Sequence, residues 1–304
     1  MRRQDFDFLL DLLRENAGWK FGETQYFILD KKITNFIRDK GYASIEDLIL
    51  ELKSGNRPLI SQVVETMAFS DTYFFRDFDI FYRFRKVLLP SLKEKCRASK
   101  KLNIWSLGCS TGQETYSIAM AINKADKMFA DWDINILGSD LSSVAIAKAQ
   151  RGIYNNFEIQ TGLTAKDILE FFTYNDEQWT IREDLKKNIE FRRYNMLERA
   201  ISKSTFEVVF CRNVLRYFAP EYQDDILRRI SEKQPQGGYL YLGKNENIPA
   251  VEKYYYKLDD VSGAYLAIGQ SSINVSSGNL AVSTPEQPEE GKMPKFIKPA
   301  NLIK

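Results

Sequence analysis

One stretch of the chain limits its fold more than any other. The apolar run Leu102–Leu107 ends at Gly108, a second glycine follows at Gly112, and an amphipathic stretch begins at once. This order predicts a buried strand, a tight turn and a helix. Such a unit is half of a nucleotide-binding βαβ motif, in which glycines let the backbone approach a ligand. The alternative is that the glycines only turn the chain.

The residues after the second glycine narrow the choice of ligand. A loop that binds nucleoside triphosphates needs Lys-Ser or Lys-Thr here, but this chain has Gln113-Glu114, and a carboxylate would repel phosphate. The G-x-G-x-x-G pattern of dinucleotide sites is also missing. The loop therefore suits a nucleoside that carries a cation, with Glu114 facing a ligand hydroxyl or ammonium.

A second strand and helix follow at the right place for the other half of the motif. The run 133–140 predicts a buried strand that ends at Asp140, and Ser142 is placed to cap a helix over 143–151. Asp140 follows the glycine turn near the spacing at which a Rossmann-type acid takes the ribose hydroxyls. The alternative role for Asp140 is to cap that helix.

Composition excludes several classes of function. The chain has 304 residues, 44% of them apolar, so it can bury a sizeable core. A net charge of +2 does not suggest nucleic-acid binding, and no apolar run reaches membrane-spanning length. We therefore expect a cytoplasmic protein that binds no nucleic acid and does not insert into a membrane.

The chain contains no histidine and three cysteines. Without histidine it cannot use a Ser-His-Asp triad, a Cys-His pair, a histidine base or histidine-ligated metal. Cys96, Cys109 and Cys211 are far apart, and the last two close predicted strands, which favours small buried groups over nucleophiles. We expect neither a metal site nor a disulfide framework.

Residues 1–85 have the apolar spacing of helices, and the rest alternates strands with helices. The second predicted helix carries a basic face that either binds a partner or is simply solvated surface: Lys31, Lys32, Arg38 and Lys40. Residues 78–89 predict a helix that Pro90 ends, with an exposed lysine-rich connection up to Lys101. Further strands are predicted over 188–195, 206–213, 237–243 and 265–268, with helices over 165–171 and 221–233 and a hairpin over 172–182. Residues 270–304 have the composition of a disordered tail.

Several motifs occur in a fixed order along the chain. They are TYFFRD at 72–77, WSLGCSTGQE at 105–114, GSDL at 138–141, GIY at 152–154 and CRNVLRYF at 211–218. Together they resemble the CheR family of chemotaxis receptor methyltransferases, and the resemblance covers roughly residues 5–270.

The resemblance implies an α/β fold. It consists of a Rossmann-like sheet that binds S-adenosylmethionine (SAM), an N-terminal all-α domain and a small inserted antiparallel β-subdomain. The implied domains are a substrate-recognition domain over 1–85 and a SAM-binding domain over 86–269, with the insertion at about 153–187.

The resemblance also implies the site. The cofactor is SAM and its product is S-adenosylhomocysteine (SAH). Asp140 would take the ribose hydroxyls, Glu114 the amino group and Arg76 the methionyl carboxylate, while Arg76 and Tyr217 would lie beside the transferring methyl. The implied cofactor-binding positions are Ser70, Thr72, Arg76, Glu114, Asp140, Asn195, Met196, Arg212 and Asn213.

The implied reaction is methyl esterification of glutamate side chains on the cytoplasmic domain of chemotaxis receptors by a monomeric enzyme. A glutamate carboxylate has a reference pKa of about 4.3 and is ionised at neutral pH, so it needs no general base. A histidine-free protein can therefore catalyse the reaction. The basic residues of the second helix would meet a glutamate-rich helical substrate.

Two other functions stay open: a scaffold that binds SAM or SAH without methylating receptors, and a methyltransferase with a different substrate. The chain also departs from the family pattern. Ser70 stands where the family often has Asn, and Met196 where it often has Leu. Some members that bind a receptor's C-terminal peptide carry a Gly-Tyr-Gly insertion in the β-subdomain, which is missing here, so tethering to such a peptide is not expected.

Overall fold

The sheet is built on the strand that precedes the glycine turn. The structure, a computed structural model, describes residues 3–199, 202, 204–258 and 263–269. Within them a seven-stranded sheet has the order β6-β2-β1-β7-β8-β10-β9. Its strands are β1 (Lys101–Leu107), β2 (Asp133–Asp140), β6 (Ile189–Arg193), β7 (Val208–Phe210), β8 (Tyr239–Tyr241), β9 (Tyr255–Lys257) and β10 (Ala264–Ala267). The first five in this order pair in parallel, and β10 pairs antiparallel with β8 and β9.

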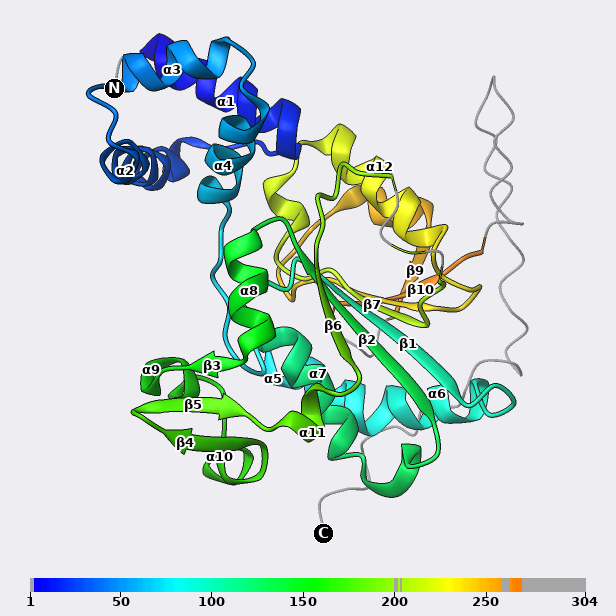
Figure 1. Ribbon diagram of the computed structural model, residues 1–304. Helices are drawn as coiled ribbons and strands as arrows, with labels where there is room; N and C mark the ends of the chain where they lie inside the picture. Colours follow the sequence, from blue (N-terminus) through cyan, green and yellow to red (C-terminus); the bar gives the residue numbers. More distant parts are fainter. Residues whose placement is uncertain (1–2, 200–201, 203, 259–262, 270–304) are drawn as a thin grey trace, which may run out of the picture.

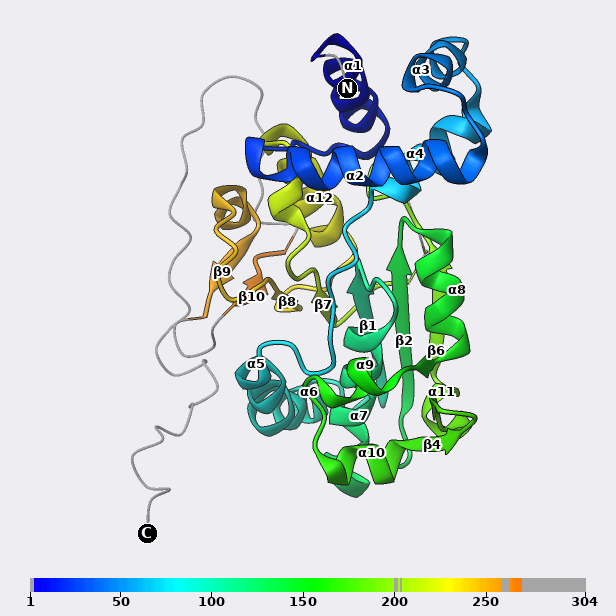
Figure 2. The same ribbon diagram turned by 90° about the vertical axis from the view of Figure 1, so that its left-hand side faces the viewer.

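Both faces of the sheet are covered. Alternate residues of β1 point to opposite sides of the sheet, so they belong to different buried clusters. Trp105 and Leu107 belong to one buried cluster and Leu102 and Ile104 to another. Each cluster also contains side chains of one group of helices, and the N-terminal helices of the first group lie beyond the carboxyl ends of the strands (Figures 1 and 2). The first cluster contains side chains of α1 (Arg3–Ala17), α2 (Glu23–Lys40), α3 (Ile45–Lys53), α4 (Arg57–Met67) and α12 (Pro220–Ser231). The second contains side chains of α5 (Phe78–Arg83), α6 (Leu89–Lys95), α7 (Gln113–Asn123) and α8 (Ser143–Arg151).

The predicted βαβ unit is confirmed. β1, the glycine turn and α7 follow one another, and Ser142 caps α8 by accepting a hydrogen bond from the N–H of Ala145 at 3.2 Å. Because β1 and β2 are parallel neighbours, Gly108 and Asp140 reach the same edge of the sheet.

The prediction that Pro90 ends a helix is wrong. The helix of α5 continues through a π-helical turn (Phe84–Leu88) into α6, where Pro90 lies in the first turn. A first-turn residue needs no N–H donor, so proline fits there. Part of the expected exposed connection up to Lys101 is thus helical. β9 was not predicted, because a three-residue strand is too short to show a clear period.

A second, three-stranded sheet of order β3-β5-β4 lies in the predicted insertion and contains the predicted hairpin. This subdomain lies below α8 in Figure 1. Its elements are β3 (Ile153–Tyr154), α9 (Asn156–Gln160), α10 (Ala165–Phe171), β4 (Phe172–Asn175), β5 (Gln178–Ile181) and α11 (Glu183–Lys186). The helical N-terminal region, the Rossmann-like sheet and the small antiparallel sheet therefore form as expected, whereas the exact domain limits stay predictions. The predicted tail at 270–304 lies outside the described residues.

The subdomain contacts the segment between α4 and α5 through backbone atoms. A Cβ atom added at Gly162 would lie 1.8 Å from the carbonyl oxygen of Phe74. The Phe74 ring meets the rings of Tyr154 and Phe172 edge-on, with centroids 5.0 and 5.6 Å away. The insertion therefore supports the 72–77 motif directly.

We predict that Gly162→Ala destabilises the protein more than Gly41→Ala does. Both glycines have a positive φ, +91° and +76°, but nothing lies within 4 Å of a Cβ added at Gly41. Gly41→Ala should cost about 1–2 kcal/mol of backbone strain. Gly162→Ala should cost a further 1–3 kcal/mol, roughly, from the steric clash. Urea unfolding followed by circular dichroism measures both, and equal losses would mean that the contact with Phe74 relaxes freely.

Candidate active site

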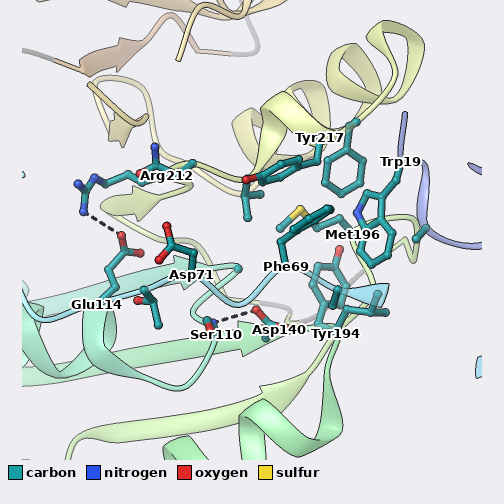
Figure 3. Close-up of a pocket in the computed structure, with 18 of the residues that line it drawn as sticks. Trp19, Phe69, Asp71, Ser110, Glu114, Asp140, Tyr194, Met196, Arg212 and Tyr217 are labelled. Atoms are coloured by element: carbon teal, nitrogen blue, oxygen red, sulfur yellow. Dashed lines mark hydrogen bonds and ion pairs between the residues drawn. The ribbon is translucent and has the colours of Figure 1, made fainter. Parts of the chain in front are cut away.

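An open cleft lies at the carboxyl ends of β1, β2 and β7, with about 980 Å³ of space not filled by atoms (Figure 3). In an open α/β sheet this edge is where ligands bind. The segment that follows α4 passes across the edge of the sheet on its way to α5 (Figure 2). The polar residues that line the cleft are Asp71, Thr72, Arg76, Ser110, Glu114, Asp140, Asn195, Arg212 and Asn213, with Trp19, Phe69, Tyr194, Met196 and Tyr217 among the larger apolar and aromatic ones.

Asp140 lies at the end of β2 and holds the glycine turn. Its carboxylate accepts hydrogen bonds from the N–H groups of Ser110 at 2.8 Å and Ser142 at 2.9 Å. Burial raises the pKa of Asp140, and these backbone donors oppose the rise. Since an ionised carboxylate offers about four acceptor positions, Asp140 retains acceptors for ligand hydroxyls. Ser142, not Asp140, provides the side-chain cap of α8.

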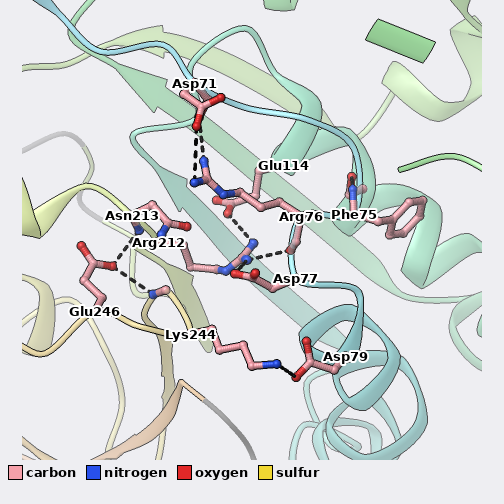
Figure 4. Close-up of polar contacts among 12 residues, drawn as sticks. Asp71, Phe75, Arg76, Asp77, Asp79, Glu114, Arg212, Asn213, Lys244 and Glu246 are labelled. Atoms are coloured by element: carbon pink, nitrogen blue, oxygen red, sulfur yellow. Dashed lines mark hydrogen bonds and ion pairs between the residues drawn. The ribbon is translucent and has the colours of Figure 1, made fainter. Parts of the chain in front are cut away.

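Arg212 joins three parts of the site (Figure 4). Its buried guanidinium contacts the carboxylates of Asp77 at 2.7 Å and Glu114 at 3.0 Å. It also donates to the carbonyl of Arg76 at 2.7 Å. Glu114 accepts a further hydrogen bond from Ser106 at 2.8 Å. Burial raises the pKa of Glu114, and the charge of Arg212 opposes this rise.

Arg76 is presented by a strained segment. Its neighbours Phe75 and Asp77 have φ values of 51° and 57°, in the left-handed region that L residues seldom occupy. The N–H of Phe75 donates to Ser117 at 2.9 Å, and Asp77 pairs with Arg212, so both ends are fixed. The guanidinium of Arg76 donates to the carbonyl of Asp71 at 2.8 Å and lies 3.5 Å from its carboxylate.

A buried glutamate shapes the loop after β7. The Glu246 carboxylate accepts hydrogen bonds from the N–H groups of Asn213 at 2.7 Å, Gly243 at 2.9 Å and Arg216 at 3.0 Å. Asn213 has a φ of 61°. Its side-chain oxygen is buried and has no hydrogen-bond partner. A buried acceptor left unpaired costs about 1–3 kcal/mol, so this oxygen suits a ligand donor in the cleft.

Tyr217 lies at the end of the same loop, where its ring stacks on Phe69 with centroids 4.7 Å apart and planes 11° from parallel (Figure 3). Its carbonyl accepts a hydrogen bond from the N–H of Lys20 at 2.7 Å. The N-terminal helical region thus contacts the loop that follows β7.

The other predicted cofactor residues divide into two groups. Thr72, Asn195 and Met196 line the cleft, and the Asn195 amide donates to the carbonyl of Asn16 at 2.8 Å. Ser70 does not line it, and its carbonyl accepts a hydrogen bond from the Ser110 hydroxyl of the glycine turn at 3.4 Å. Sequence spacing alone does not show whether Ser70 or a residue next to it lines the cleft.

The four predicted basic residues of α2 do not share one surface. Lys31 and Arg38, seven residues apart, lie on the same side of the helix and are exposed. Lys32 is partly buried. Its ammonium donates to the carbonyls of Thr66 and Ala68. Lys40 is exposed elsewhere on the helix, with its ammonium 5.8 Å from the Phe36 ring centroid.

Sequence reasoning missed Trp19, Phe69, Asp71, Tyr194 and Glu246. Aromatic residues indicate core more often than site, and Glu246 is an isolated acidic residue in a loop, so no pattern marked them. The two glycines of the turn also allow close packing within the protein. A Cβ added at Gly108 would lie 2.5 Å from Val214, and one added at Gly112 would lie 2.9 Å from the Cβ of Ala149 in α8.

The residues that the structure describes contain no group of three or more Cys, Asp or Glu side chains arranged to hold a metal ion, and the chain has no histidine. None of their helices is long and apolar enough to span a membrane.

Comparison with known proteins identifies the family. Residues 70–264 match the CheR methyltransferase SAM binding domain. The chain is 30% identical over 255 residues to chemotaxis protein methyltransferase 1 of Pseudomonas aeruginosa, covering 83% of this chain and 93% of the relative. It is 27% identical over 252 residues to the chemotaxis protein methyltransferase of Borreliella burgdorferi, covering 81% and 89%.

Among solved structures, PKMT2 of Rickettsia typhi in complex with AdoHcy has a TM-score of 0.33 and 16% identity over 58% of this chain and 26% of that one. The family match spans more than half of the chain. It includes the segment before α5 and the carboxyl ends of β1, β2 and β7, which line the cleft. The chain therefore belongs to the CheR family and is a SAM-dependent methyltransferase of chemotaxis.

Proposed function

We propose that this enzyme methylates glutamate side chains on the cytoplasmic domain of chemotaxis receptors. The observation that carries the proposal is that Arg76 and Tyr217 line one cleft together with Asp140 and Glu114. This gives an acidic site for the ribose and ammonium of SAM, and a guanidinium and a phenol for carboxylates. The absence of histidine agrees with a substrate that is already ionised.

The residues of the cleft suit SAM. Asp140 would hold the ribose hydroxyls, Glu114 the ammonium and Arg76 the methionyl carboxylate, while the unpaired oxygen of Asn213 would accept a ligand N–H or O–H. When bound, SAM would supply a methyl group on a positively charged sulfur for transfer to a glutamate oxygen, with the carbon–sulfur electron pair left on sulfur and no proton transferred.

The chain's own residues then have to orient the attacking carboxylate and keep water away from it. Arg76 and Tyr217 would do this by charge and by a hydrogen bond. We further propose that the region 1–85 recognises the substrate, and that Lys31 and Arg38 meet its acidic groups. A monomer remains the prediction for the oligomeric state.

We predict that Asp140→Ala weakens SAH binding roughly 5- to 150-fold, because a lost ribose contact costs about 1–3 kcal/mol. Titration calorimetry measures this. The control is Ser142→Ala, which removes the cap of α8 and should cost about 1 kcal/mol of stability without changing SAH affinity. Unchanged affinity in Asp140→Ala would remove Asp140 from the ribose site.

Tyr217→Phe should lower kcat for receptor methylation by roughly one to three orders of magnitude and leave the melting temperature and SAH affinity near wild type. Deleting a preorganised donor from a dry site costs about 2.7–4 kcal/mol, and less where water substitutes. Transfer of labelled methyl groups to receptor-containing membranes measures kcat. Tyr256→Phe, on β9 away from the cleft, is the control, and wild-type kinetics in Tyr217→Phe would contradict its role.

Reversing Lys31 and Arg38 to Glu should raise KM for the receptor at low salt and leave SAH affinity unchanged, because exposed charges act mainly on encounter. The difference should shrink as salt rises. The control reverses two exposed charges away from α2, Arg97→Glu with Lys187→Glu. Equal KM values for the two double variants would show that the exposed charges of α2 are only solvated surface.

A further inference from the structure

The backbone around Tyr217 is fixed on both sides, but its ring needs a separate constraint. The N–H of Tyr217 donates to the Val214 carbonyl at 3.2 Å, and its own carbonyl accepts from Lys20 at 2.7 Å. These bonds do not determine the side-chain torsion. The ring is partly buried, and the Phe69 ring stacks on it with centroids 4.7 Å apart and planes 11° from parallel.

Phe69 is itself held from the side of the N-terminal helices. The Phe21 ring lies 5.7 Å from it at a tilt of 48°. The ammonium of Lys32 lies 5.5 Å from the Phe69 ring centroid, within the range of a cation–π contact. The same ammonium donates to the carbonyl of Thr66 at 3.1 Å and to that of Ala68, directly before Phe69.

These contacts form a continuous stack from α2 to the cleft: Lys32, Phe69, Tyr217. Burial lowers the pKa of Lys32, but three oriented acceptors, two carbonyls and a ring face, favour its charged form. Lys31 and Arg38 are exposed and lie about 100–120° away from Lys32 around the axis of α2. Lys32, which the sequence groups with a substrate-binding surface, therefore contacts Phe69 in the lining of the cleft instead.

We propose that Phe69 is a positioning residue that orients the Tyr217 phenol for methyl transfer, and that Lys32 holds Phe69 in place. The inference rests on the proposed function of Tyr217. Stacking restricts the ring torsion of Tyr217, so that the hydroxyl is already aimed when the glutamate carboxylate arrives. An aliphatic residue at 69 would fill space but would not keep the ring parallel.

The central test is Phe69→Leu. Loss of an aromatic pair should lower kcat roughly three- to tenfold, with little change in KM or SAH affinity. Phe69→Trp retains a flat ring and should keep kcat within about twofold of wild type. Lys32→Met should lower kcat in the same direction as Phe69→Leu by a smaller factor.

Phe36→Leu is the matched control. Phe36 is buried in the same cluster of helices and has Lys40 over its ring at 5.8 Å, but it does not line the cleft. It should lower the melting temperature at least as much as Phe69→Leu and leave kcat unchanged. A fall in kcat that follows the melting temperature across both variants would overturn the proposal.

A double-mutant cycle separates positioning from packing. In a Tyr217→Phe background no hydroxyl remains to be aimed, so adding Phe69→Leu should change kcat less than about twofold. An equal fall in both backgrounds would assign Phe69 a general role in the shape of the cleft. A wild-type kcat in Phe69→Leu would also overturn the positioning role.

A spectroscopic readout tests the stack without any turnover. In protein labelled with 3-fluorotyrosine, the ¹⁹F resonance of Tyr217 is the one lost in Tyr217→Phe. It should shift in Phe69→Leu, which removes a ring current, and stay near its place in Phe36→Leu; an unmoved resonance in Phe69→Leu overturns the stack. If the wild-type enzyme forms no methyl ester on the receptor, the proposed substrate is wrong. If Tyr217→Phe has the same kcat as the wild type, only the proposed role of Tyr217 is refuted.

Discussion

The site depends on one buried cation. The Arg212 guanidinium ties the end of β7 to the start of α7 through Glu114 and to the segment before α5 through Asp77 and the Arg76 carbonyl. Removing charges from water is costly, and a buried ion pair stabilises a fold only when its geometry is good and its remaining donors are satisfied. The Nε of Arg212 has no partner among the described residues, so this group does not maximise stability. Its effect is to fix the relative position of three chain segments that would otherwise be independent.

Backbone strain is concentrated around the same group. Phe75, Asp77, Ser110 and Asn213 all have positive φ values and all belong to the loops around the cleft. Each such residue costs about 1–2 kcal/mol. Each is held by a specific polar partner: Phe75 by Ser117, Asp77 by Arg212, Ser110 by Asp140 and Asn213 by Glu246. Buried polar groups in these loops therefore act on backbone conformation as well as on ligand binding.

Much of this arrangement could be predicted from the sequence, because strand periodicity and glycine turns are local signals. β1, α7, β2 and the Ser142 cap follow from such signals, and the parallel pairing of β1 with β2 brings Asp140 to the glycine turn. The inward position of Lys32 could not be predicted, since it depends on where α4 ends. The contact of Gly112 with α8 and the position of Pro90 in the first turn of α6, after a π turn, could not be predicted either. These outcomes are decided by tertiary packing, which a single sequence does not display.

The contact between Gly162 and Phe74 has a consequence for how such enzymes diversify. An inserted subdomain is usually regarded as a part that can be exchanged, because its two ends enter and leave one edge of the sheet. Here its loop lies directly against a carbonyl in the motif that presents Arg76, and a Cβ on that glycine would be 1.8 Å from the oxygen. A subdomain transplanted from a relative would have to bring a glycine to the same point and a matching pair of rings for Phe74. Changes on the outer surface of the insertion therefore leave this contact intact, whereas changes in its inner loop displace the segment that presents Arg76.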